Sequence, residues 1–116
     1  MIDQLGSVAH ESGAALIVDE TNTGCGATGN GFWAYGGNAA DYTTFGKRVQ
    51  ATGYFSNSPE GSSIRVGGSE FDVALFSLIK QEIDGGNLIE LVARVGKSMH
   101  SSDEKATANS KKITGV

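Results

Sequence analysis

The sequence predicts an α/β fold in which helices flank a mostly parallel sheet. The segment "AALIVDE" at 14–20 is apolar up to its final two acids, which is typical of a central strand buried on both faces of a parallel sheet. The stretches 71–83 and 88–99 instead repeat their apolar residues with a helical period. The chain has 116 residues, about the size of one domain.

The remaining elements follow from local patterns. A loose three-residue apolar period at the start predicts a short helix that Gly13 ends. β-branched and aromatic residues predict two further strands, and Gly-rich polar stretches predict loops. The expected order is helix 2–12, strand 14–20, loop 21–40, strands 41–46 and 51–56, loop 57–69, and two helices separated by "DGG" at 84–86. Because this order lacks a first strand and ends on the strand-like "KKITGV", we interpret the chain as a piece of a larger α/β protein.

Composition excludes several classes of partner. Thirteen acids and nine bases give a net charge of −4, which argues against nucleic-acid binding. No stretch approaches the roughly 20 apolar residues of a membrane span. Cys25, the only cysteine, cannot form an internal disulfide, so a reducing compartment is expected. The two histidines lack partners at metal-ligand spacing, and no metal site is predicted.

The segment "LIVDETNTGCGATGNG" at 16–31 carries the chemistry, because its strand ends at Asp19 and Glu20 and glycines follow. "GCGATG" matches G-x-G-x-x-G, but in a dinucleotide fold the glycines directly follow the strand and open a helix. Here four residues intervene and no helical period follows. A P-loop ATPase also has acids at a strand end, but G-x-x-x-x-G-K-[ST] is absent from the sequence. Both alternatives are therefore disfavoured.

A third interpretation pairs Asp19 with Lys47. Each stands at or just past the carboxyl end of a predicted strand, where open α/β sheets bind ligands. An amine and a carboxylate facing one cleft suit pyridoxal phosphate, since lysine forms a Schiff base with its aldehyde and a carboxylate keeps its ring nitrogen protonated. Spacing alone leaves open that Asp19 is a solvated strand cap and Lys47 a surface lysine.

The order of residues carries a further resemblance. "LIVDETNTGCGATGNGFWAY" followed by "DYTTFGKRVQATGYF" resembles the class III, fold-type I aminotransferases, in particular those that act on 4-aminobutyrate (GABA). Their strand-end D-E-x-Q-T-G, Gly-rich loop, "FWA" segment and T-F-x-K-[KR] lysine come in the same order. The likeness is strong over 14–56 and weaker through the helices. It implies that residues 1–83 belong to the large pyridoxal-phosphate domain and 84–116 to a linking helix and the start of a small C-terminal domain.

The resemblance implies a role for individual residues. Lys47 would be the catalytic Schiff-base lysine, and Asp19 the partner of the pyridine nitrogen. Asn22 stands where the family usually has a glutamine that contacts the cofactor's phenolic oxygen, so this contact is expected to be longer or bridged by water. Glu20 is expected to be structural. Trp33 and Tyr35 are expected to pack the loop onto the sheet rather than line the cleft.

The chain also departs from the family pattern. The family binds the cofactor phosphate with a threonine of the neighbouring subunit, but no threonine stands in 57–70, and Ser62, Ser63 or Ser69 would have to replace it. The phosphate loop, the ring-stacking aromatic residue and the substrate-binding arginines lie outside the sequence. The resemblance thus implies a homodimeric parent that transfers an amino group from an ω-amino acid to a 2-oxo acid, mitochondrial if it resembles the animal members. This fragment is expected to be inactive alone; the alternative is a non-catalytic remnant or interaction fragment.

Overall fold

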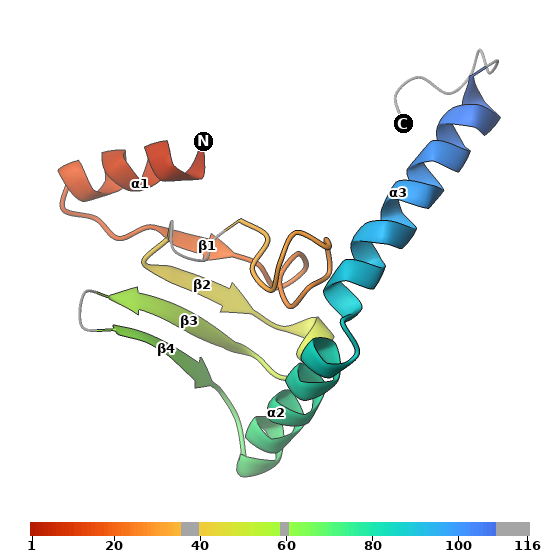
Figure 1. Ribbon diagram of the computed structural model, residues 1–116. Helices are drawn as coiled ribbons and strands as arrows, with labels where there is room; N and C mark the ends of the chain where they lie inside the picture. The colour runs from red at the N-terminus through yellow and green to blue at the C-terminus, as the bar shows by residue number, and fades with distance from the viewer. Residues whose placement is uncertain (36–39, 59–60, 109–116) are drawn as a thin grey trace.

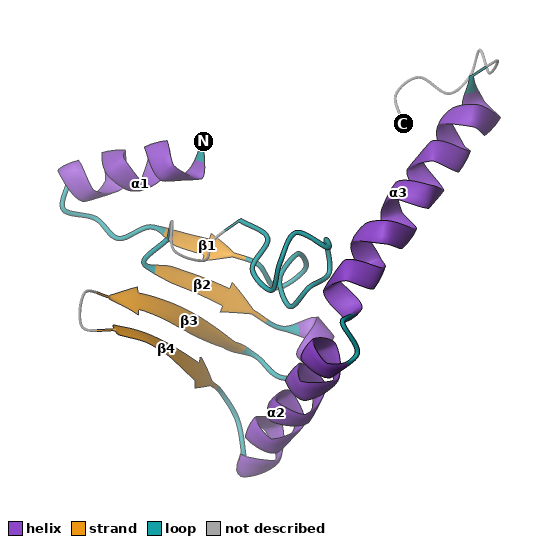
Figure 2. Ribbon diagram, viewed as in Figure 1, coloured by secondary structure: helices purple, strands orange, loops and turns teal. Residues whose placement is uncertain are grey.

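A computed structural model describes residues 1–35, 40–58 and 61–108 of the chain (Figure 1). The described residues form one four-stranded sheet, three α-helices and a short 3₁₀ helix, η2. Figure 2 shows the helices around the sheet and the long loop that follows the first strand. In chain order the elements are α1 (Ile2–Glu11), β1 (Ile17–Asp19), β2 (Tyr42–Phe45), η2 (Lys47–Val49), β3 (Gly53–Ser58), β4 (Gly61–Val66), α2 (Glu70–Gly85) and α3 (Leu88–Thr107). The α/β class predicted from the sequence is therefore confirmed.

The sheet order is β1-β2-β3-β4, and the prediction of a mostly parallel sheet is wrong for the described strands. Only β1 and β2 are parallel, with Asp19 opposite Thr44. β2 pairs antiparallel with β3, and β3 antiparallel with β4. The connection at 46–52 explains the first reversal, because a parallel return needs a crossover of about a dozen or more residues. The predicted strands at 41–46 and 51–56 are both present, shifted slightly in their bounds.

Strand β4 replaces part of the predicted loop 57–69. Its sequence "GSSIRV" lacks apolar alternation, and five of its six residues are exposed. It becomes a strand through pairing with β3, where Tyr54 lies opposite Arg65 and Ser58 opposite Gly61. Local sequence could not predict it, because strand preference depends strongly on the neighbouring strand.

Strand β1 was expected in the centre of the sheet with both faces covered, and this prediction is also wrong within the described chain. β1 is only three residues long and lies at the sheet edge, paired with β2 alone. Ile17 is 62% exposed. The apolar run 14–20 therefore has more hydrophobic surface than the described residues cover.

The core lies between one face of the sheet, α2 and the loop after β1. Phe45 and Phe76 place their ring centroids 5.1 Å apart, which packs β2 against α2. Trp33 of the loop lies 5.9 Å from Phe45 and 5.4 Å from Phe55, again between ring centroids. These contacts join the loop, the sheet and α2 into one hydrophobic cluster that also includes Val49, Ala51, Ile83 and Cys25.

Helices α1 and α3 pack much less than α2. α3 has 20 residues and none is buried, and Gly6 is the one buried residue of α1. Figure 1 shows α3 projecting away from the sheet. The radius of gyration is 17.4 Å, larger than the roughly 13 Å of a compact domain of this size. No described helix combines the length and apolar character needed to cross a membrane.

Candidate functional site

The carboxyl ends of the two parallel strands bring the predicted site residues to one edge of the sheet. Asp19 is the last residue of β1, and Lys47 follows β2 after a single residue, Gly46. The register places Asp19 directly opposite Thr44. We expected Asp19 and Lys47 to lie together at the carboxyl ends of neighbouring strands. In the structure both residues stand at these ends of β1 and β2.

Asp19 is an exposed carboxylate that accepts hydrogen bonds from Thr21 and Thr44. Its Oδ1 accepts a hydrogen bond of 2.9 Å from the Thr21 backbone N–H and another of 2.9 Å from Thr44 Oγ1. The Thr21 backbone bond, followed by the side-chain bonds from Thr44 and Thr21, lowers the pKa of Asp19, and the positive charge of Lys47 lowers it further. Hydrogen bonds to the charged form favour ionisation, so the carboxylate remains negative at neutral pH.

The amine of Lys47 is held by the loop that follows β1. Its Nζ donates a hydrogen bond to Oδ1 of Asn22. No ion pair joins Lys47 to Asp19, although both lie in the described part of the chain. The lysine amine therefore contacts Asn22 rather than Asp19. The expected contact of Asn22 with a cofactor oxygen stays a prediction.

The backbone at Lys47 has an uncommon conformation. Lys47 has φ of +42° and Gln50 has φ of +52°, both in the left-handed region. Side chains with a Cβ seldom occupy this region, which costs roughly 1–3 kcal/mol. Gln50 Nε2 donates to the Lys47 carbonyl at 3.0 Å, and buried Val49 fixes the turn between them. The strain coincides with the residue that the sequence singles out for chemistry.

Glu20 serves the structure, as expected. It is 1% exposed, and its two carboxylate oxygens accept hydrogen bonds from the backbone N–H groups of Ala34 at 2.6 Å and Tyr35 at 2.7 Å. These bonds fasten the far end of the loop to the strand that starts it. Trp33 packs on the core as predicted, but the prediction for Tyr35 is wrong, because its side chain is 56% exposed.

The Gly-rich loop packs against the start of α3 (Figure 2). A Cβ on Gly26 would lie 2.9 Å from Ile89, and one on Gly29 would lie 2.7 Å from backbone atoms of Ala93. Both glycines also have positive φ, of +80° and +76°. These glycines therefore permit close packing of a loop on a helix, in a segment without the helix that a dinucleotide fold would place there.

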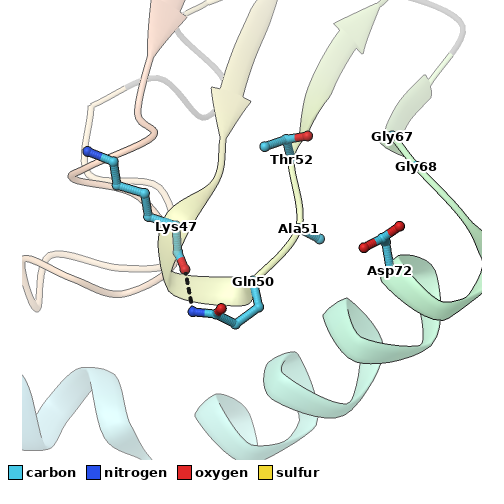
Figure 3. Close-up of a pocket in the computed structure, with 7 residues that line it drawn as sticks. All are labelled: Lys47, Gln50, Ala51, Thr52, Gly67, Gly68 and Asp72. Atoms are coloured by element: carbon cyan, nitrogen blue, oxygen red, sulfur yellow. Dashed lines mark hydrogen bonds between the residues drawn. The ribbon is translucent and has the colours of Figure 1, made fainter.

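A cavity of about 370 Å³ lies beside Lys47 but on the other side of its backbone (Figure 3). Gln50, Thr52 and Asp72 contribute to its lining. Figure 3 shows the Lys47 amine pointing away from these residues, toward the end of β1. Lys47 is one of the residues that line this cavity, but its amine points out of it, toward Asn22.

The serines proposed as phosphate ligands already have local partners. Ser62 Oγ bonds Asn57 and Ser63 Oγ bonds Ser56, each at 3.1 Å. Ser69 caps α2 through a reciprocal pair with Asp72. A role of one of these serines in binding phosphate stays a prediction.

Sequence reasoning missed Thr21 and Thr44, which hold Asp19. Thr21 lies two residues after the aspartate, the spacing at which an Asp side chain accepts from the backbone in an Asx turn, so this contact was detectable. Thr44 comes from a different strand. Its contact depends on the β1–β2 register, which the sequence does not give.

Comparison with known proteins relates the chain to aminotransferases over part of their length. It is 42% identical over 57 residues to a 4-aminobutyrate aminotransferase of Mycosarcoma maydis and 40% identical over 57 residues to one of Dictyostelium discoideum; each match covers 46% of this chain and 11% of the relative. An L-lysine-epsilon aminotransferase of Amycolatopsis lactamdurans is 32% identical over 100 residues, or 83% of this chain and 21% of the relative. The chain matches no protein-family profile. No solved structure matches it either.

Proposed function

We propose that the chain is part of the pyridoxal-phosphate domain of a class III, fold-type I aminotransferase. The observation that carries this proposal is the meeting of Lys47, Asn22 and Asp19 at the ends of two parallel strands. The partial identity to 4-aminobutyrate and L-lysine-epsilon aminotransferases supports it independently of the geometry. The chain spans 11–21% of the length of these relatives, so the activity proposed is that of a longer parent protein.

The chemistry of the three residues fits pyridoxal phosphate. An amine can bind the cofactor's aldehyde carbon, and an ionised carboxylate can accept a hydrogen bond from its protonated ring nitrogen. The lowered pKa of Asp19 keeps the required negative charge at neutral pH. The bound cofactor would supply an electron sink for the substrate carbon that loses a proton.

Each residue then has a separate task. Lys47 would bind the cofactor and carry the proton to and from the substrate carbon. Asp19, fixed by Thr21 and Thr44, would orient the ring through its nitrogen. Asn22 would hold the lysine amine in the direction seen here, in addition to the cofactor contact implied by the resemblance.

The substrates and assembly of the parent follow from the same proposal. It would take the amino group of an ω-amino acid such as 4-aminobutyrate and deliver it to a 2-oxo acid. It would act as a homodimer, with residues 1–83 in the large domain and 84–116 leading into a small one. Residues 109–116, including the strand-like ending, lie outside the described residues. A mitochondrial location stays a prediction.

Cofactor trapping on the 116-residue chain tests the lysine directly. The protein is mixed with pyridoxal phosphate, reduced with borohydride, digested and analysed by mass spectrometry. We expect preferential labelling of Lys47, absent in Lys47→Arg and unchanged in Lys80→Arg, which alters a half-buried lysine paired with Asp84. We also expect Asp19→Asn to reduce labelling at Lys47. Labelling spread equally over all lysines, with no loss in Lys47→Arg, would contradict the proposal.

A non-catalytic interaction fragment is the second candidate. The uncovered α1 and α3 favour it, because both carry exposed apolar side chains such as Val8 and Met99. Preferential labelling of Lys47 together with absence of transaminase activity would support a cofactor-binding fragment that needs the rest of the parent. Absence of both would favour the non-catalytic alternative.

A further inference from the structure

A second cavity, of about 260 Å³, lies between the Gly-rich loop, α2 and α3. Its walls are mainly apolar, with Ile79 and Ile83 from α2 and Ile89 and Val92 from α3. Cys25 closes it from the loop; this thiol is 5% exposed, and desolvation raises its pKa to about 11. The loop, α2 and α3 therefore give the cavity mainly apolar walls, and η2 adds one further residue, Arg48.

Arg48 is the one charged residue among the described residues that line this cavity. Its guanidinium is exposed to solvent and forms no hydrogen bond or ion pair with the side chain or backbone of another described residue. Lys80, which follows Ile79 in α2, by contrast pairs with Asp84 at 2.6 Å, and its Nζ lies 5.3 Å from the ring centroid of Phe32. A free guanidinium beside apolar walls has positive charge that the described chain does not neutralise.

These two properties select one chemical class of ligand. A guanidinium binds a carboxylate through two parallel hydrogen bonds, and apolar walls bind hydrocarbon. No carboxylate occurs among the described residues that line the cavity, which disfavours a cation. The volume lies just below the roughly 300–1,000 Å³ of typical ligand sites, so the ligand is small.

We propose that this cavity binds a small apolar monocarboxylate, with its carboxylate on Arg48 and its hydrocarbon part between α2 and α3. The site is separate from the Lys47 amine, which meets Asn22 at the end of β1. Lys47 and Arg48 are consecutive in η2, so a ligand on Arg48 would bind the same turn that carries the lysine. The proposal does not depend on pyridoxal phosphate binding.

Titration of the 116-residue chain with 3-phenylpropionate, followed by amide NMR shifts, tests this site. The neutral isostere 3-phenylpropan-1-ol shows what the carboxylate contributes, and acetate shows what the ring contributes. We expect saturable shifts at the loop, α2 and the start of α3, with the acid binding about tenfold more tightly than the alcohol. Acetate should bind more weakly than both.

Variants separate the guanidinium from the cavity. Arg48→Gln should make the acid and the alcohol bind equally, whereas Arg94→Gln, which alters an exposed arginine of α3 outside this cavity, should leave the preference intact. Val92→Phe should weaken both ligands by filling the space. Equal binding of acid and alcohol to the wild type, unchanged preference in Arg48→Gln, or shifts that do not saturate would overturn the proposal.

Discussion

The central part of the molecule and its two outer helices differ sharply in how they are packed. We call β2, η2, β3 and α2 the central body; it buries Phe45, Val49 and Phe76 to 6% exposure or less. α3 buries no residue and α1 buries only Gly6. Lys47 stands two residues after Phe45 and two before Val49. The candidate chemical residue is therefore anchored where the chain is best packed, while the outer helices leave apolar faces uncovered.

Removing the Phe45 ring should give the largest loss in the free energy of unfolding. It therefore tests whether the central body is packed more tightly than the outer helices. Phe45→Ala deletes a ring that contacts Trp33 and Phe76, and we expect a loss of about 3–5 kcal/mol in the free energy of unfolding. Met99→Ala on α3 removes a side chain that is 62% exposed and should cost less than about 0.5 kcal/mol. Urea denaturation followed by circular dichroism measures both. Equal losses would show that the two regions are not packed differently.

Gly29, in the loop after β1, packs against Ala93 of α3. Its replacement should give the next largest loss in the free energy of unfolding. Gly29→Ala combines positive φ with a clash against the Ala93 backbone, so we expect a cost of about 2–3 kcal/mol. Gly13→Ala is the matched control, because Gly13 also has positive φ but no neighbouring atoms within 4 Å; it should cost roughly 1 kcal/mol. Thermal unfolding compares them. Equal costs would mean that the loop moves away from α3 freely.

Two substitutions of Lys47 should measure the strain of its left-handed backbone. Lys47→Gly and Lys47→Ala both remove the hydrogen bond to Asn22, but only glycine adopts φ of +42° without strain. We therefore expect the glycine variant to be more stable than the alanine variant by about 1 kcal/mol. The difference between their urea midpoints measures this difference in stability. An alanine variant that equals or exceeds the glycine variant would contradict a left-handed backbone at this residue.

Acid should weaken the attachment of α1 by a smaller amount. The hydrogen bond from His10, and then the backbone N–H of Leu16, lower the pKa of Asp41. Because the folded pKa lies below that of the unfolded chain, Asp41 stabilises the fold above the usual value of 3.8, and this stability is lost as the pH falls through the folded pKa. Asp41→Asn should flatten this acid-side loss, measured by unfolding at several pH values. If stability depends on pH in the same way in Asp41→Asn as in the wild type, ionised Asp41 does not stabilise the fold.

The sequence predicted the elements whose signal is local. The helical periods of α2 and α3 and the strand ending at Asp19 depend on residues close together in the chain, and all three are present. Lys47 could be placed near Asp19 because both follow strand-like segments that proved to be adjacent and parallel. Their roles as cofactor residues stay a prediction.

What the sequence missed depends on distant partners. β4 exists because β3 pairs with it, and Thr44 reaches Asp19 because of one register. Antiparallel pairing of β2 with β3 depends on the turn formed by η2 and the following Gln50. No sequence pattern marks the left-handed backbone of Lys47 and Gln50 in this turn. The contact between Asn22 and Lys47 likewise joins residues 25 positions apart. Such contacts follow from the assembled fold rather than from local preference.

The two hydrogen bonds of Glu20 have a consequence for how this protein can be altered. They join the start and the end of the segment 21–35, so that its ends stay together whatever its length. Extra residues inserted after exposed Asn30, beyond the contact of Gly29 with Ala93, would enlarge a ring that is already closed, at a small entropic cost. That position is therefore a suitable place for a fluorescent label or an epitope tag that leaves Asp19 undisturbed.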